Sequence, residues 1–227
     1  MLAEAFGGAL VPLVLPGLPE REPGAALDAR ALGPWTLLGA ARDASGRERL
    51  PGAREELAAL AGFHGERARA LVGATCDRAA LLAAFSRGGP LHVATHLARA
   101  SDDGGRYEAL GLELAGGDVA TAAEIAAARP RLPLVALVAC ETAAGRFVDA
   151  EGLLGVARAF LESGTRDLLV TLWPVEDRAA REYALLWHAA LREGLAPSRA
   201  AARARAELAA KGVSPAEWAA FRLCGRD

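Results

Sequence analysis

Cysteine is scarce in this sequence, and its spacing excludes two common structural roles. The 227 residues contain three cysteines, Cys76, Cys140 and Cys224, and no two of them form a C-x-x-C pair. An odd number of widely spaced cysteines fits neither a disulfide framework nor a zinc ribbon. A reducing, cytoplasmic environment is therefore the simplest expectation.

Long apolar runs are absent as well. The longest one near the N-terminus, residues 9–16, contains two prolines, and no basic residue precedes it. This stretch is too short to span a membrane, and its flank does not match a signal peptide. We expect neither a membrane span nor a secretory leader.

A strong excess of charge of either sign is also missing. Lys and Arg number 26 against 28 Asp and Glu, which gives a formal net charge of -2 and a pI near 6.1. This balance argues against a protein that binds nucleic acid or a membrane surface through a basic face. Lysine occurs once, at Lys211, and alanine is abundant, which we take as the mark of a GC-rich bacterial genome.

Short apolar runs alternate with amphipathic stretches from residue 34 onward. This alternation is typical of a parallel sheet whose strands are joined by crossover helices. The predicted strands are Trp35–Gly39, Ala68–Val72, Leu91–Thr95, Leu134–Ala139 and Leu168–Leu172. The predicted helices are Gly52–Ala61, Asp77–Phe85, Thr121–Ala128, Glu151–Leu161, Asp177–Arg192 and Ser198–Ala210.

The segment before residue 34 has a different composition. Residues 1–33 are rich in proline and glycine, which interrupt helices and strands. We expect them to form an irregular N-terminal segment or linker, followed by one α/β domain over residues 34–227. Such a segment also favours a chain that is a fragment of a longer protein.

Two of the predicted strands end in residues with catalytic potential. His96 follows the strand over 91–95 and Cys140 follows the strand over 134–139, and their spacing of 44 residues is enough for a single crossover. The carboxyl ends of neighbouring parallel strands meet in a crevice. A cysteine and a histidine there form a nucleophile and its base, because a nearby imidazole lets the thiolate form near neutral pH.

Simpler structural roles stay open for both residues. A lone cysteine at the end of an apolar strand is usually a small buried hydrophobe, and a lone histidine beside a strand is usually structural. A metal site at His92 and His96 is disfavoured, because four residues along a strand span roughly 13 Å. We expect His92 to pack beneath the site, and we expect no metal or other cofactor.

Four short motifs follow one another at intervals that point to a known family. They are Leu-His-Val-Ala-Thr-His at 91–96, Ala-Cys-Glu-Thr-Ala at 139–143, Glu-Gly-Leu-Leu-Gly-Val-Ala-Arg-Ala-Phe-Leu at 151–161 and Thr-Leu-Trp-Pro-Val-Glu-Asp at 171–177. Together they resemble the CHAT domain, a family of caspase-like cysteine peptidases related to separases and often fused to tetratricopeptide repeats. The segments that begin at Leu50-Pro51-Gly52 and at Trp218 are also similar to it.

The resemblance implies a caspase-like three-layer α/β/α sandwich with a mostly parallel central sheet, and peptide-bond hydrolysis. It makes Cys140 the nucleophile and His96 the catalytic histidine, with an oxyanion hole formed by the amides of Cys140 and Leu97. The family usually has glycine where this chain has Leu97, and glycine permits close approach and unusual dihedrals. A catalytically weak or inactive caspase-like interaction module is therefore the alternative, and another cysteine-dependent enzyme, an acyl transferase or amidase, is a second one.

The resemblance also implies a substrate pocket at the end of the next strand. In separases an acidic residue of this segment takes up the basic side chain before the cleaved bond, a role that falls here to Asp177, or to Glu176 in its place. Asp177 fits equally as the N-cap of the following helix. Glu141 would line the pocket or fix its loop, and Trp173 would be a pocket wall or a core aromatic.

A thiol protease in a cytoplasm must be held inactive, so a regulatory partner is expected. The resemblance suggests a sensor such as tetratricopeptide repeats, and a protein or peptide substrate cut in a bacterial signalling or defence pathway. Residues 98–109 and 143–150 are expected to be loops beside the site. Such loops usually carry specificity or are remodelled on activation, and the alternative is that both are ordinary solvent-exposed connections.

Overall fold

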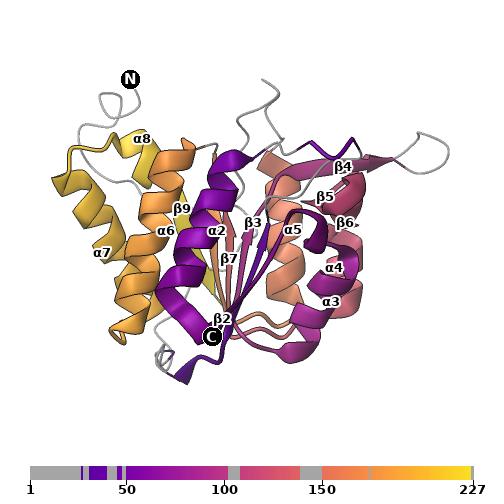
Figure 1. Cartoon of the computed structure of the whole chain (residues 1–227), viewed down its shortest axis with the longest axis horizontal. Coiled ribbons are helices and arrows are strands. Elements are labelled where there is room, and N and C mark those ends of the chain that lie inside the picture. The colour runs from indigo at the N-terminus through magenta and orange to yellow at the C-terminus, as the bar shows by residue number, and fades with distance from the viewer. Residues whose placement is uncertain are drawn as a thin grey trace.

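A six-stranded sheet forms the centre of the computed structural model (Figure 1). The structure describes residues 27, 31–39, 45–47, 50–101, 108–138, 150–173 and 175–225. The strands of the central sheet are β1 (Trp35–Gly39), β2 (Ala68–Val72), β3 (Leu91–Ala94), β7 (Leu134–Val138), β8 (Asp167–Thr171) and β9 (Phe221–Gly225). They lie in the order β2-β1-β3-β7-β8-β9, and all neighbours are parallel except β8 and β9.

Helices cover both faces of this sheet, as Figure 1 shows. One face carries α2 (Pro51–His64), α6 (Asp177–Arg192) and α7 (Pro197–Ala210), followed by the short α8 (Pro215–Trp218). The other face carries α3 (Arg78–Arg87), α4 (Ala122–Ala128) and α5 (Ala150–Glu162). The chain also contains the 3-10 helices η2 (Gly65–Arg67), η3 (Gly73–Thr75) and η4 (Ala115–Gly117). The predicted three-layer sandwich with a mostly parallel sheet is confirmed.

Each face of the sheet has an apolar core of its own. The core under α2, α6 and α7 includes Leu57 and Trp187, and the core under α3, α4 and α5 includes Leu81 and Phe160. Among the described residues, no helix is both long enough and apolar enough to cross a bilayer.

Alternate residues of β3 face opposite cores. Leu91 and Val93 belong to the core under α3, α4 and α5, whereas Ala94 belongs to the core under α2, α6 and α7. Because side chains alternate along a strand, His92 shares the face of Ala94. This alternation directs His92 into the layer formed by α2 and α6.

A second, three-stranded antiparallel sheet was not predicted. It consists of β4 (Leu97–Ser101), β5 (Glu108–Glu113) and β6 (Val119–Thr121), in that order. The prediction of a loop over residues 98–109 is thus wrong for its described parts, which are strand residues. The reason is physical: these strands carry polar and small residues instead of a long apolar run, and they are held by pairing across the hairpin.

The last strand of the central sheet, β9, was not predicted from the sequence either. β9 lies antiparallel to β8, with Cys224 opposite Leu168, so the last strand closes a sheet that is otherwise parallel. The predicted loop over 143–150 falls outside the described residues except for Ala150, where α5 begins.

The segment before the sheet is described only in part. Leu32 is buried in the core under α2 and α6, and the Arg67 side chain donates a hydrogen bond to its carbonyl at 2.8 Å. Residues 1–26 lie outside the description. The division of the chain at residue 33 stays a prediction.

Candidate functional site

Strands β3 and β7 are direct neighbours in the sheet, as the 44-residue spacing predicts. Ala94 pairs with Val138 at their carboxyl ends. His96 comes two residues after Ala94, and Cys140 comes two residues after Val138. Cys140 and Glu141 lie outside the described residues, so the structure describes only the histidine of the predicted pair.

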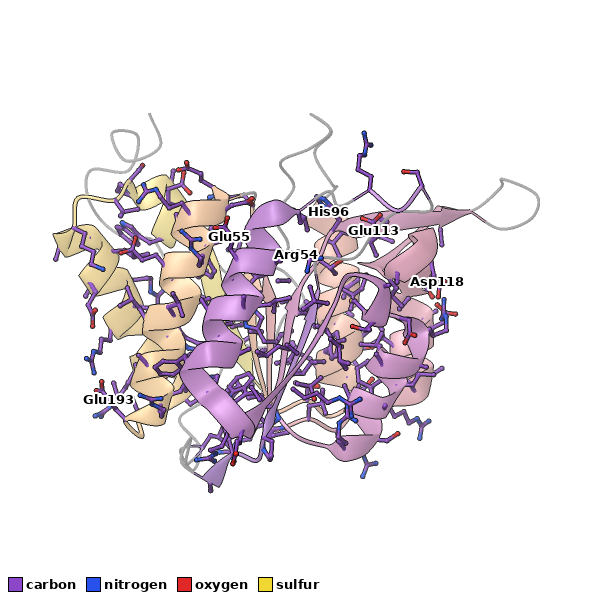
Figure 2. All side chains as sticks on the ribbon, viewed as in Figure 1. Arg54, Glu55, His96, Glu113, Asp118 and Glu193 are labelled. Atoms are coloured by element: carbon purple, nitrogen blue, oxygen red, sulfur yellow. The ribbon has the colours of Figure 1, made fainter. Side chains whose placement is uncertain are left out.

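The backbone around His96 is fixed by the last residue of β5. The Thr95 hydroxyl donates to the Glu113 carbonyl at 2.7 Å, and the Glu113 amide donates to the His96 carbonyl at 2.9 Å. Figure 2 shows His96 and Glu113 next to each other at the edge of the sheet, with His96 just beyond β3. All three residues are buried. The sequence does not predict this position of Glu113, because no local pattern pairs it with residues 95–96.

Leu97 is the first residue of β4 and lies opposite Leu112. Residues 96 and 113 form a hydrogen-bonded position of the antiparallel ladder. The next position is then a non-hydrogen-bonded one, and the N–H of Leu97 points away from β5. Among the described residues, Arg129 alone of the non-glycines has a positive φ, so Leu97 does not need a glycine conformation. Its side chain packs against the core under α3, α4 and α5.

Glu176 and Asp177, the two acidic candidates for substrate binding, lie at the start of α6. Glu176 occupies the N-cap and Asp177 is the first helical residue, so the predicted N-cap role of Asp177 is wrong by one position. The Glu176 side chain is exposed, and its amide donates to Glu217 Oε2 at 3.0 Å. Asp177 is half-buried.

The Asp177 side chain lies directly on Gly52, the second residue of α2. A Cβ at Gly52 would stand 2.2 Å from Asp177 Oδ2 and 2.4 Å from its Cγ, which real atoms do not tolerate. An ion pair between Glu55 and Arg181 ties the beginnings of the same two helices together. The segments at 50–52 and 171–177 therefore meet in space, a contact that neither segment predicts by itself.

Trp173 lies at the surface beyond β8. Its side chain is 37% exposed, and its Nε1 donates to the Ala216 carbonyl at 2.7 Å. This exposure removes the core alternative for Trp173. The hydrogen bond holds the ring against α8.

The two described cysteines are free thiols of the core. Cys76 and Cys224 are buried, and neither forms a disulfide. Burial, with a smaller contribution from the charge of Asp77, raises the pKa of Cys76 to about 12, and burial also raises the pKa of Cys224. Because the thiolate is the reactive form, both are inert near neutral pH.

His92 takes no part in the edge where His96 lies. It is fully buried and contacts Glu56 and His188 through its two ring nitrogens. In the described part of the chain, no group of three or more His, Cys, Asp or Glu side chains is arranged to hold a metal ion.

Comparison with known proteins assigns the chain to a family. A model of the CHAT domain matches residues 14–226. Tetratricopeptide repeat protein 28 of Mus musculus is 37% identical over 109 residues, which are 47% of this chain and 4% of that protein. The Homo sapiens protein of the same name is 37% identical over 82 residues, or 35% of this chain and 3% of its own length, so the match covers only a small part of either relative. The chain belongs to the CHAT domain family, which is related to the caspase-like peptidases.

Proposed function

We propose that this chain is a cysteine endopeptidase that uses a dyad of Cys140 and His96. The observation that carries the proposal is the pairing of β3 with β7, in which Ala94 lies opposite Val138. His96 and Cys140 each follow two residues later in the sequence, so we expect both at the same edge of these adjacent strands. In open α/β sheets this edge is where reactive groups gather.

The chemistry needs only these two side chains and water. The Cys140 thiolate attacks the scissile carbonyl and forms a C–S bond, while His96 gives a proton to the leaving amine as the C–N bond breaks. Water then attacks the thioester, with His96 taking its proton, and the new carboxylic acid leaves as the thiol is restored. No cofactor enters this sequence.

The amides of Cys140 and Leu97 are the proposed oxyanion donors. The orientation of the Leu97 N–H away from β5 supports this role, because that amide is not spent on the ladder. The hydrogen bonds among Thr95, His96 and Glu113 support it further, since a preorganised donor stabilises the transition state without reorganisation.

Asp177 is the proposed recognition residue for a basic side chain before the cleaved bond. Its half-buried carboxylate lies at the beginning of α2 and α6, which is the edge of the sheet where β3 also ends. Glu176 is an exposed second carboxylate beside it, and Trp173 is the proposed pocket wall. Glu141 is proposed as a further lining residue on sequence position alone.

The setting of the enzyme is also a proposal. Relatives named for tetratricopeptide repeats support a regulatory partner built from such repeats. A protein or peptide as substrate follows from the proposed peptidase activity alone. A bacterial source and a cytoplasmic location rest on composition and cysteine spacing, and the two relatives are mammalian. We propose that the peptidase acts in a regulated signalling or defence pathway.

Thiol labelling tests the dyad, and the chain contains its own reference. Iodoacetamide at neutral pH is expected to modify Cys140 well before Cys76, whose pKa burial raises to about 12. His96→Asn is expected to slow labelling of Cys140 and to lower peptide cleavage by about 10²- to 10⁴-fold. Cys140→Ala is expected to abolish cleavage. The modified residues are identified by mass spectrometry.

The alternatives give different results in the same experiment. If Cys140 reacts no faster than Cys76 and His96→Asn changes nothing, the chain is an inactive interaction module. If Cys140 is reactive and dependent on His96, but only small amides turn over and a peptide library stays intact, the chain is another cysteine-dependent enzyme.

A further inference from the structure

Three of the four histidines of this chain lie in one buried row outside the candidate active site. Glu56 Oε1 is 2.7 Å from His92 Nε2, and His92 Nδ1 is 3.2 Å from His188 Nε2. His188 Nδ1 is in turn 2.9 Å from His64 Nε2. The row joins α2, β3 and α6.

The row is continuous because each inner ring uses both of its nitrogens. A neutral imidazole carries one N–H donor and one acceptor nitrogen, so three rings in series must all point their donors the same way. In one arrangement every Nε2 carries the hydrogen and His92 donates to an ionised Glu56. In the reverse arrangement His188 and His64 carry their hydrogens on Nδ1.

We infer that Glu56, His92, His188 and His64 form a proton relay that stores one proton deep in the core and exchanges it with solvent at His64. Glu56, His92 and His188 are buried, and the half-buried His64 is the end that solvent reaches. The inference does not rest on the peptidase proposal.

The proton balance of the relay is simple. A proton from solvent binds His64 Nδ1, and the hydrogen on His64 Nε2 passes to His188 Nδ1. The hydrogen on His188 Nε2 passes to His92 Nδ1, and the proton that arrives last is shared in the Glu56–His92 hydrogen bond. The two contacts between histidines persist with their direction reversed, and the Glu56–His92 hydrogen bond persists with the shared proton. One positive charge has then neutralised the buried carboxylate, which is costly to keep ionised away from water.

The surroundings of the row disfavour a charged ring at its outer end. Among the described residues, the charged groups outside the row that act on His64 are Arg192 of α6 and Arg67 of η2. Burial, aided by Arg192, His92 and Arg67, lowers the pKa of His64 to about 4. Burial also lowers the pKa of His188 well below its ordinary value, with help from His92 and His64. A charged ring is therefore disfavoured at both His64 and His188.

Packing holds the rings in line. Trp35 of β1 stacks on His64 with ring centroids 5.7 Å apart and lies 4.3 Å from the His188 ring. Arg192 stands 3.9 Å above the Phe63 ring and donates to the Phe63 carbonyl at 2.8 Å, which fixes the end of α2 beside His64. The rings thus have little freedom to leave the row.

The test is to measure the tautomeric state of each histidine by ¹⁵N NMR on the full chain. At neutral pH we expect His64 and His188 to be neutral with the hydrogen on Nε2. On acidification from about pH 7.5 to about pH 4.5, where histidine and glutamate ordinarily titrate, we expect both rings to stay neutral and to shift the hydrogen to Nδ1 together. The two nitrogens of His188 would then exchange their pyrrole-like and pyridine-like shifts.

Two variants and one control make the result decisive. Glu56→Gln keeps the size of the inner end but removes the negative charge that holds the added proton in the hydrogen bond with His92, so the pH-dependent reversal at His188 is expected to vanish. His64→Phe, at the half-buried end, is expected to block the same reversal if Glu56→Gln does not fold. Tyr183→Phe, on the same helix but bonded to the Ala201 carbonyl, is expected to behave like the parent.

Either of two findings would overturn the relay. One is an imidazolium form of His64 or His188 in this pH range, and the other is a tautomer reversal of His188 that survives in Glu56→Gln.

Discussion

At the scale of single residues, the contact between Gly52 and Asp177 joins two segments that sequence analysis treated separately. Asp177 fills the volume that a Cβ of residue 52 would need, so a glycine is required on α2 for the carboxylate to lie where it does. The requirement is one of space. The glycine at position 52 therefore affects the proposed recognition of substrate by Asp177.

Gly52→Ala is therefore expected to displace the Asp177 carboxylate and to weaken cleavage after Arg or Lys, chiefly through a higher KM. Labelling of Cys140 should stay close to the parent, because the change does not touch residues 94–97. Asp177→Asn should show the same loss of preference for basic over neutral peptides. Steady-state kinetics on matched peptide pairs provides the measurement.

The matched control lies on the same helix. Gly62 has open space around its Cα, so Gly62→Ala should leave the kinetics unchanged and add about 0.5–1 kcal/mol to the free energy of unfolding. If Gly52→Ala kept the preference for basic over neutral peptides, the positioning role of Gly52 would be refuted. If the parent protein cleaved none of the peptides, the peptidase proposal itself would be refuted.

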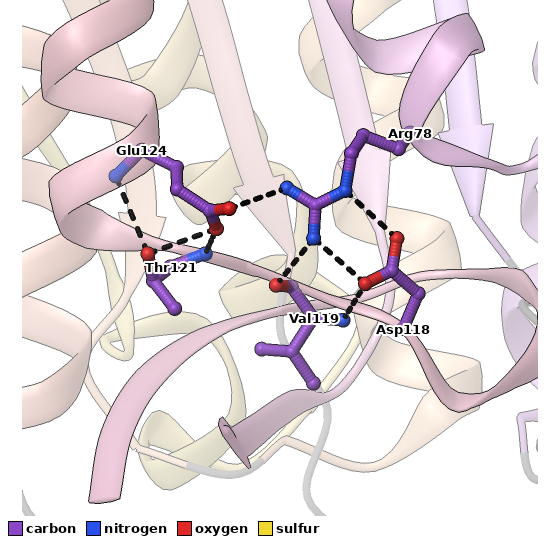
Figure 3. Close-up of polar contacts among 5 residues, drawn as sticks. All are labelled: Arg78, Asp118, Val119, Thr121 and Glu124. Carbon is purple, nitrogen blue, oxygen red and sulfur yellow. Dashed lines mark hydrogen bonds and ion pairs between the residues drawn. The ribbon is translucent and has the colours of Figure 1, made fainter. Parts of the chain in front are cut away.

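At the scale of elements, one arginine ties α3 to the small sheet and to α4 (Figure 3). Arg78 Nε and Nη2 donate to the two Asp118 oxygens at 2.9 and 2.7 Å, and Nη1 donates to Glu124 Oε1 at 2.7 Å. Glu124 also accepts from the Thr121 amide at 2.8 Å, which completes the predicted capping box of α4. The hydrogen bond from Arg78 lowers the pKa of Asp118, and the bond from Thr121 is the main cause of the lowered pKa of Glu124.

Removing this arginine should weaken the fold in a pH-dependent way. Arg78→Gln is expected to lower the free energy of unfolding at pH 7 by about 1 kcal/mol, a modest figure because these side chains are 38–50% exposed. A lowered folded-state pKa stabilises the protein above the unfolded-state pKa and loses that effect as the carboxylates become protonated. The difference between variant and parent should thus shrink below about pH 4.

Urea unfolding at several pH values measures this difference. Arg203→Gln serves as the control, because Arg203 pairs with Glu193 and Glu207 on an exposed helical surface, where ion pairs contribute little. A difference for Arg78→Gln that stays constant down to pH 3 would contradict the assignment.

At the scale of the whole molecule, two apolar cores share one sheet. Trp35 and Trp187 both belong to the core under α2, α6 and α7, whereas Phe85 and Phe160 belong to the opposite core. The two phenylalanine rings meet edge to face at 5.8 Å. Since every strand of the parallel sheet contributes to both cores, the two faces should unfold together.

Phe160→Ala tests that coupling. It should lower the free energy of unfolding by about 3–5 kcal/mol, because a fully buried aromatic ring is lost. The midpoint followed by tryptophan fluorescence, which reports mainly on the opposite face, should fall together with the midpoint followed by far-UV circular dichroism. Leu82→Ala, at a side chain 47% exposed, should change neither midpoint appreciably. Separate midpoints in Phe160→Ala would show that the faces unfold independently.

The sequence by itself determined five of the six strands of the central sheet and the long helices packed on it. The apolar runs at Trp35–Gly39 and Ala68–Val72 are strands with the predicted bounds, and α6 spans the predicted Asp177–Arg192. These elements are recognisable because each buries a continuous run or a helical stripe, and that pattern is local. That β3 and β7 are neighbours in the sheet was predicted from the length of the chain between them, which is enough for a single crossover.

Tertiary structure alone decided the contacts between distant segments. The pairing of β9 with β8 and the contact of Asp177 with Gly52 depend on partners far along the chain. His92 shows the difference most clearly: its burial was expected from its place in an apolar strand, but its link to Glu56 and His188 was not. Local sequence specifies which side chains leave water, whereas the packing of helices on the sheet determines which polar groups meet when they do.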